Sequence, residues 1–100
     1  MVGTQDVFNS QMGGIFVMES AARRLGLRIR EIRLRLMEQD STYSLEGVAR
    51  RLNWPTSRLR QIEMTRTTMI EPEEIRMIAD ALGVEPRELL AAAYGDLIGV

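Results

Sequence analysis

The most restrictive feature of this sequence is a short interruption, Asn53-Trp54-Pro55, between two stretches of helical periodicity. Proline disfavours helical geometry in the residue before it, so one helix cannot continue through this point. Two helices joined by so short a turn can cross steeply only where the residue facing the crossing is small, and Ala49 is in that place. The turn also needs a residue with positive φ, which asparagine tolerates better than most residues, and Asn53 supplies it. The sequence therefore predicts a sharp corner between two helices.

The residues around this corner are apolar where two crossing helices must share a core. Val48 and Leu52 precede the turn at helical spacing, and Leu59 and Ile62 follow it. One matching residue alone is uninformative, but suitable residues at all of these positions together favour a helix-turn-helix over an ordinary helical hairpin. The predicted core of this motif consists of Val48, Ala49, Leu52, Asn53, Trp54, Leu59 and Ile62.

Helical periodicity also accounts for most of the remaining chain. Apolar residues recur at spacings of three and four in the first helix, and Ser44 suits the N-cap of the second. Pro72 and Pro86 suit the first turns of two later helices, and Gly83 suits the end of the first of these. We expect an all-α fold of five helices, over residues 19–38, 44–52, 56–64, 72–82 and 86–93, joined by loops that include 39–43 and 65–71.

The two ends of the chain lack this periodicity. Residues 1–18 contain glycines and almost no charge, and we expect an arm that is flexible or docked on a partner. Its apolar run, residues 15–18, is compatible with a short strand, such an arm or an unordered stretch. Residues 94–100 form an apolar tail. The helix-turn-helix domain is therefore predicted to span residues 19–93.

Composition limits the chemistry that this chain can perform. It has no cysteine and no histidine, which excludes disulfides, thiolate zinc sites and the commonest general base. No run approaches the roughly 18 apolar residues of a membrane span, and the N-terminus lacks the pattern of a signal peptide. We expect a cytoplasmic protein that has no metal, cofactor, membrane segment or enzymatic activity.

Charge is distributed unevenly along the chain, although the net charge is only −1. Residues 20–66 contain eleven arginines and five acidic residues, whereas residues 67–100 contain two arginines and seven acidic residues. This asymmetry predicts a basic face for a polyanion and an acidic face behind it, with ordinary solvated helix surfaces as the alternative. Every basic residue is arginine, which suits paired hydrogen bonds to phosphate and guanine.

Beyond the motif, the sequence resembles the lambda-repressor/Cro-like DNA-binding domains, a family of bacterial and phage regulators often called the XRE family. The resemblance covers about Leu25 to Leu90 and implies that the third helix enters the major groove of DNA. It rests on the stretches Arg30-Glu31-Ile32-Arg33, Ser44-Leu45-Glu46-Gly47-Val48-Ala49, Ser57-Arg58-Leu59-Arg60-Gln61-Ile62-Glu63, Ile78-Ala79-Asp80-Ala81-Leu82-Gly83-Val84 and Glu88-Leu89-Leu90.

The resemblance implies base contacts by the third helix. Arg60 and Gln61 are the predicted base readers, because arginine pairs with guanine and glutamine with adenine through two hydrogen bonds each. Ser57 and Thr56 are expected to contact a base edge, a thymine methyl group or a phosphate. For Thr56, capping of the third helix is an equal alternative.

The resemblance also implies phosphate contacts and a structural ion pair. The predicted phosphate contacts are Thr42, Ser44, Arg58 and Arg66. A solvated helix position is the alternative for Arg58, and simple capping is the preferred one for Ser44. Arg33 and Glu63 match a family ion pair that ties the first helix to the end of the recognition helix.

Three departures from the family pattern concern the DNA contacts more than the fold. The loop 39–43 is longer than usual. Thr65 stands where the family has glycine two residues after the acidic Glu63, and Glu46 brings a carboxylate close to the expected phosphates.

The resemblance implies a regulator of transcription that binds double-stranded DNA and lies on the nucleoid when bound. We expect a repressor that acts as a homodimer on a pseudo-palindromic operator. The alternative is a protein-interaction module, such as an antitoxin or a helix-turn-helix domain without DNA binding. Its partner would bind the apolar ends, residues 15–18 and 97–100, which otherwise complete the core or the dimer contact.

Overall fold

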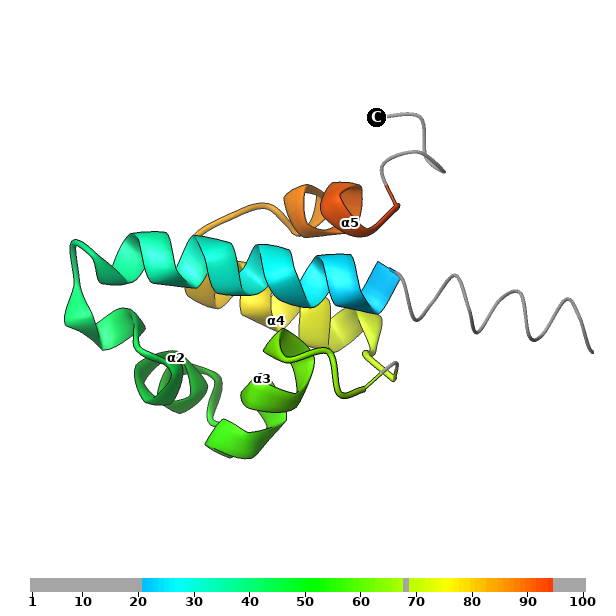
Figure 1. Cartoon of the computed structure of the whole chain (residues 1–100). Coiled ribbons are helices and arrows are strands. Elements are labelled where there is room, and N and C mark those ends of the chain that lie inside the picture. Colours follow the sequence, from blue (N-terminus) through cyan, green and yellow to red (C-terminus); the bar gives the residue numbers. More distant parts are fainter. Residues whose placement is uncertain (1–20, 68, 95–100) are drawn as a thin grey trace, which may run out of the picture.

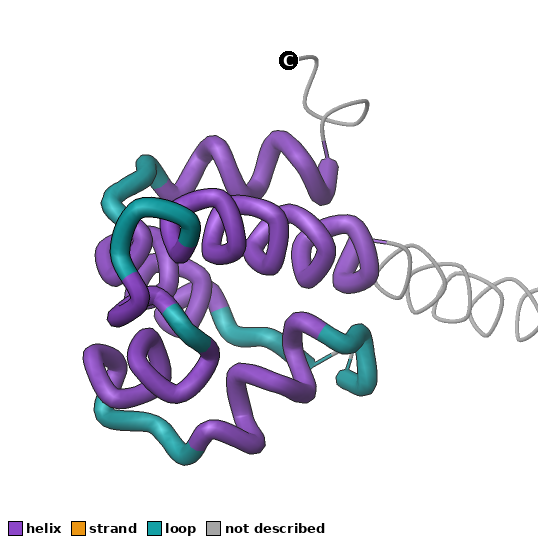
Figure 2. Tube along the Cα trace, turned by 60° about the vertical axis from the view of Figure 1, so that its left-hand side comes forward, coloured by secondary structure: helices purple, strands orange, loops and turns teal. Residues whose placement is uncertain are grey.

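The computed structural model describes residues 21–67 and 69–94, so the arm 1–18 and the tail residues 95–100 lie outside it. A first helix covers residues 21–37 of this range. It is followed by the 3-10 helix η1 (Ser41–Tyr43) and by α2 (Leu45–Leu52), α3 (Thr56–Glu63), α4 (Pro72–Leu82) and α5 (Pro86–Tyr94). Figure 2 shows only helices and loops in the described residues, which confirms the predicted all-α fold with five α-helices.

The structure differs from the sequence prediction at the boundaries of several elements. The prediction of a plain loop over 39–43 is wrong, because Ser41–Tyr43 form η1. The Asp40 side chain accepts a hydrogen bond from the backbone N–H of Thr42, a local contact that favours a tight turn over an extended loop. α3 ends one residue earlier than predicted, at Glu63, and α5 extends to Tyr94, which the prediction placed in the tail.

The first helix crosses the middle of the domain, with α5 on one side and α2 and α3 on the other (Figure 1). Every α-helix contributes apolar side chains to one shared core. Burial of each large apolar side chain contributes about 1.5–3 kcal/mol, so this core fixes the relative placement of the helices. The largest fully buried side chains are Ile29, Val48, Leu59, Ile62, Ile78 and Leu89.

A glycine allows the first helix to lie directly on the end of α3. A Cβ atom at Gly26 would overlap the backbone carbonyl oxygen of Ile62, and it would also lie 3.3 Å from the carbonyl oxygen of Glu63. The two backbones can therefore approach this closely only because position 26 has no side chain. This contact sets the depth at which the C-terminal end of α3 sits in the domain.

Candidate nucleic-acid interface

The corner between α2 and α3 has the backbone geometry that the sequence requires. Asn53 has φ 59° and ψ 40°, in the left-handed region. The N–H of Asn53 donates to the carbonyl of Arg50, and the N–H of Trp54 donates to the carbonyl of Ala49 at 2.9 Å. These two bonds end α2 and turn the chain toward α3. Ala49 itself is only 1% exposed, so the crossing leaves no room for a larger side chain.

The predicted core residues of the motif lie where the two helices meet. Val48, Ala49 and Leu52 of α2 and Leu59 and Ile62 of α3 are buried. Trp54 is half-buried and packs against this core, whereas Asn53 is exposed at the corner. The motif is therefore a packed unit that presents the remaining surface of α3 to solvent.

Three of the four predicted base readers are exposed on α3. Ser57, Arg60 and Gln61 are exposed, and Thr56 is half-buried. Pro55 occupies the N-cap position of α3, so Thr56 is the first helical residue and does not cap the helix. These four residues form a polar face, which we call the α3 face.

Arg58, also on α3, is held by α4 and by the connection before it. Its Nε donates to Glu74 at 2.9 Å and its Nη2 donates to the other carboxylate oxygen at 2.6 Å. Nη2 also donates to the backbone carbonyl of Met69 at 2.8 Å. The hydrogen bond from Arg58 holds the pKa of Glu74 below its usual range, even though partial burial acts in the opposite direction.

Sequence reasoning missed the partner of Arg58. From the sequence, Glu74 is recognisable only as a carboxylate near the positive end of its helix. Its side chain also accepts a hydrogen bond from the backbone N–H of Glu71, which fixes the carboxylate at the start of α4. Nothing local in the sequence relates Arg58 to Glu74, because the pair forms only once α3 and α4 are packed.

A second ion pair fixes the other end of α3. Arg33 donates through Nε and Nη2 to the two carboxylate oxygens of Glu63, at 2.6 and 2.9 Å. Its Nη1 also donates to the backbone carbonyl of Tyr43 at 3.2 Å. Both side chains are buried, with exposed fractions of 8% and 3%. This pair therefore joins the first helix, the end of η1 and the end of α3, and it serves orientation more than net stability.

The predicted phosphate contacts Thr42 and Ser44 lie just before α2, Thr42 in η1 and Ser44 at the N-cap of α2. The Ser44 side chain accepts a hydrogen bond from the N–H of Gly47 at 3.0 Å, so it caps α2. The Thr42 hydroxyl donates to Asp40 at 2.7 Å and accepts from Arg51 at 2.6 Å. The hydrogen bonds that the hydroxyl and the backbone N–H of Thr42 donate to Asp40 hold the pKa of that carboxyl below its usual value.

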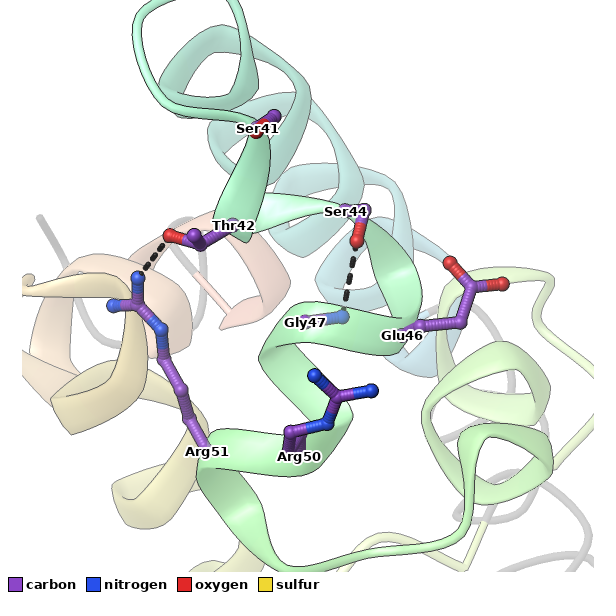
Figure 3. A pocket seen from close by; sticks show the side chains of 7 residues that line it. All are labelled: Ser41, Thr42, Ser44, Glu46, Gly47, Arg50 and Arg51. Atoms are coloured by element: carbon purple, nitrogen blue, oxygen red, sulfur yellow. Dashed lines mark hydrogen bonds between the residues drawn. The ribbon is translucent and has the colours of Figure 1, made fainter.

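Thr42 and Ser44 line an open depression beside the start of α2 (Figure 3). Arg51 extends toward Thr42, with its guanidinium carbon 4.1 Å from the centre of the Tyr43 ring. Arg50 lies nearer Gly47 and Glu46. The depression is lined by Ser41, Thr42, Ser44, Glu46, Gly47, Arg50 and Arg51. Because most of these residues are polar or charged, they suit the phosphate backbone of a nucleic acid better than an apolar small molecule.

Three arginines on or directly after the motif form no ion pair with another described residue. Among the residues that the structure describes, Arg50 of α2, Arg60 of α3 and Arg66 after α3 have no ion-pair partner. All three are exposed. Exposed, unpaired guanidinium groups on both helices of the motif make this side of the domain attractive to a polyanion. Glu46, which is exposed in the first turn of α2, opposes this attraction locally.

Two further kinds of feature, a cluster of metal ligands and a membrane-spanning helix, are absent from the described part of the chain. In residues 21–67 and 69–94, no three potential metal-ligating side chains gather. None of the described helices has the length and apolar character needed to cross a bilayer.

The profile of one protein family, described as helix-turn-helix domain, matches residues 24–93. This match confirms the resemblance to lambda-repressor/Cro-like domains, and it includes part or all of each of the five α-helices described above. No curated protein and no solved structure matches the chain significantly.

Proposed function

The chain belongs to the helix-turn-helix domain family, and on that premise we propose that it is a sequence-specific regulator of transcription. In this proposal α3 enters the major groove of double-stranded DNA and the start of α2 faces the phosphate backbone. The protein acts in the cytoplasm, on the nucleoid when bound.

The observation that carries this proposal is the α3 face itself. Ser57, Arg60 and Gln61 are exposed together on a helix whose opposite side is buried. Arg60 has no ion-pair partner among the described residues, so its guanidinium group is free to form two hydrogen bonds with guanine. Gln61 offers the matching pair of hydrogen bonds for adenine.

Phosphate contacts complete the proposed interface. Arg66 follows α3 and is exposed. Thr42 and Ser44 lie just before α2, where the positive end of the helix favours an anion. Arg50 extends the set, since it lines the depression beside the start of α2.

We further propose that the protein represses transcription as a homodimer on a pseudo-palindromic operator. Two copies with the same recognition helix read two half-sites about one helical turn of DNA apart. The alternative, a protein-interaction module, depends on the apolar runs at 15–18 and 97–100, and both lie outside the described residues.

Selection of bound sequences from a random pool of double-stranded DNA tests the proposal directly. We expect one enriched motif with two related halves, and a complex that contains two protein chains per site. Binding to that motif should weaken steeply as salt rises, because arginine–phosphate contacts release counterions. No enrichment, together with no binding at low salt, would refute DNA binding.

A further inference from the structure

Among the α3 residues predicted to contact DNA, Arg58 has the surroundings that differ most from those of a DNA contact. The other arginine of this helix, Arg60, is exposed and has no ion-pair partner among the described residues. Arg58, in contrast, uses Nε and Nη2 for three hydrogen bonds, two to Glu74 and one to the carbonyl of Met69. Its side chain is only 24% exposed, and that of Glu74 is 21% exposed.

We infer that Arg58 and Glu74 form a positioning pair that sets the angle of the recognition helix, and that Arg58 makes no phosphate contact. This inference rests on the proposed function, because it assigns a role within the DNA-binding face. It replaces the phosphate contact that the sequence resemblance predicted for Arg58. It also makes Glu74, on α4, a determinant of DNA affinity from outside the motif.

The shortness of α3 explains why such a pair is needed. The helix has eight residues and buries only two apolar side chains, Leu59 and Ile62. Its C-terminal end is fixed by the buried Arg33–Glu63 pair. Arg58 lies five residues before Glu63, about 7.5 Å earlier along the helix axis. The two ion pairs therefore hold α3 at two separate points along its length, in addition to the packing of its two buried apolar side chains.

The geometry of the Arg58–Glu74 pair suits this role. Two parallel hydrogen bonds between a guanidinium group and a carboxylate define an orientation as well as a distance. The carboxylate is itself held, because the N–H of Glu71 donates to it at 3.0 Å. The third bond, to the carbonyl of Met69, ties the connection before α4 to the same arginine. A phosphate that drew Nε or Nη2 of Arg58 away would have to break these contacts, so Nη1 is the nitrogen left for an added contact.

Substitutions that remove either partner distinguish a positioning pair from a phosphate contact. We would compare Arg58→Met, Glu74→Gln, the double variant and Arg58→Lys, each on the DNA sequence selected by the unaltered protein. We expect about tenfold weaker binding in Arg58→Met and Glu74→Gln and no further loss in the double variant. The dependence of log Kd on log salt concentration should keep its slope. Arg58→Lys should not restore binding, because lysine lacks the planar pair of donors.

A phosphate contact by Arg58 predicts different results. The salt slope would fall by about 0.9 in Arg58→Met, Arg58→Lys would retain most of the affinity, and Glu74→Gln would not weaken binding. That pattern would overturn the inference. The matched control is Arg76→Met, which removes an exposed ion pair with Glu73 on the same helix, α4, and should leave DNA affinity unchanged.

Amide hydrogen exchange without DNA gives a readout independent of the proposed function. In Arg58→Met and in Glu74→Gln, the amides of α3 should exchange several times faster than in the unaltered protein, whereas Arg76→Met should leave them unchanged. If the unaltered protein binds no DNA, the proposed function fails, while exchange still decides whether the pair holds α3. Unchanged exchange in both variants would overturn the inference.

Discussion

Asn53 and Thr65 end α2 and α3 in the same left-handed backbone conformation, with φ of 59° and 57°. In both places the next N–H reaches back five residues: Trp54 donates to the carbonyl of Ala49, and Arg66 donates to the carbonyl of Gln61. The two helix ends therefore have the same backbone motif, but the conformational energy of the left-handed region differs between the two residue types. Asparagine tolerates this region, whereas a β-branched threonine is strained there.

This strain predicts that Thr65→Gly stabilises the domain. A left-handed conformation costs a residue with a Cβ roughly 1–2 kcal/mol, and the extra freedom of glycine in the unfolded chain offsets part of that relief. We expect a net increase of about 0.5–1 kcal/mol in the free energy of unfolding by urea. Asn53→Gly is the matched control and should change it by only a few tenths of a kcal/mol. A loss of stability in Thr65→Gly would contradict this account.

The same position shows what the sequence could and could not reveal. The absence of the family's glycine at residue 65 was visible, and so were Ala49, Asn53 and the apolar core of the motif, because each follows from local turn chemistry or helical spacing. The left-handed backbone at residue 65 is indicated only by the glycine that the family has there, because threonine itself gives no signal for it. The Arg58–Glu74 pair and the contacts of Arg51 were also missed, since they depend on how separate elements pack.

The buried ion pair between the first helix and α3 predicts a large loss when one partner is removed. Glu63→Gln leaves the guanidinium of Arg33 buried without a compensating charge, and we expect the free energy of unfolding to fall by about 3–5 kcal/mol. Urea unfolding followed by circular dichroism measures this. In the control Glu31→Gln, which removes an exposed carboxylate near Arg28 and Arg35, we expect no measurable change. Equal effects of the two substitutions would show that burial of the Arg33 pair is unimportant.

Close approach of the first helix to α3 predicts that Gly26→Ala destabilises the domain. In an exposed helix this substitution stabilises by up to about 1 kcal/mol, because alanine is the better helix former. Here the added Cβ would overlap the carbonyl oxygen of Ile62, so the helices must separate. We expect a loss of about 1–3 kcal/mol in the free energy of unfolding. A higher urea midpoint in Gly26→Ala would disprove the contact.

Acid should weaken the Arg58–Glu74 pair in a defined pH range. The hydrogen bond from Arg58 lowers the pKa of Glu74 in the folded protein. Glu74 therefore contributes stability above the pKa of an unfolded glutamate, which is about 4.3. That contribution is lost as pH falls below this value and through the lower folded pKa. We expect Glu74→Gln to be less stable than the unaltered protein at pH 6–7, with the difference shrinking below about pH 4. A constant difference from pH 7 to pH 3 would mean that the charge of Glu74 is not responsible.

The exposed guanidinium of Arg60 predicts a specificity defect that leaves the fold intact. Arg60→Ala removes the two hydrogen bonds proposed for one guanine, so discrimination at that base pair should fall by about 1–3 kcal/mol. Competition with operators altered one base pair at a time measures this, and the melting temperature should not change, because Arg60 is exposed. Arg87→Ala removes an arginine of α5 that is also exposed, and it should leave every base preference intact. If Arg60→Ala weakened all sequences uniformly, Arg60 would contact the phosphate backbone, and the reading of bases by the α3 face would rest on Gln61 and Ser57.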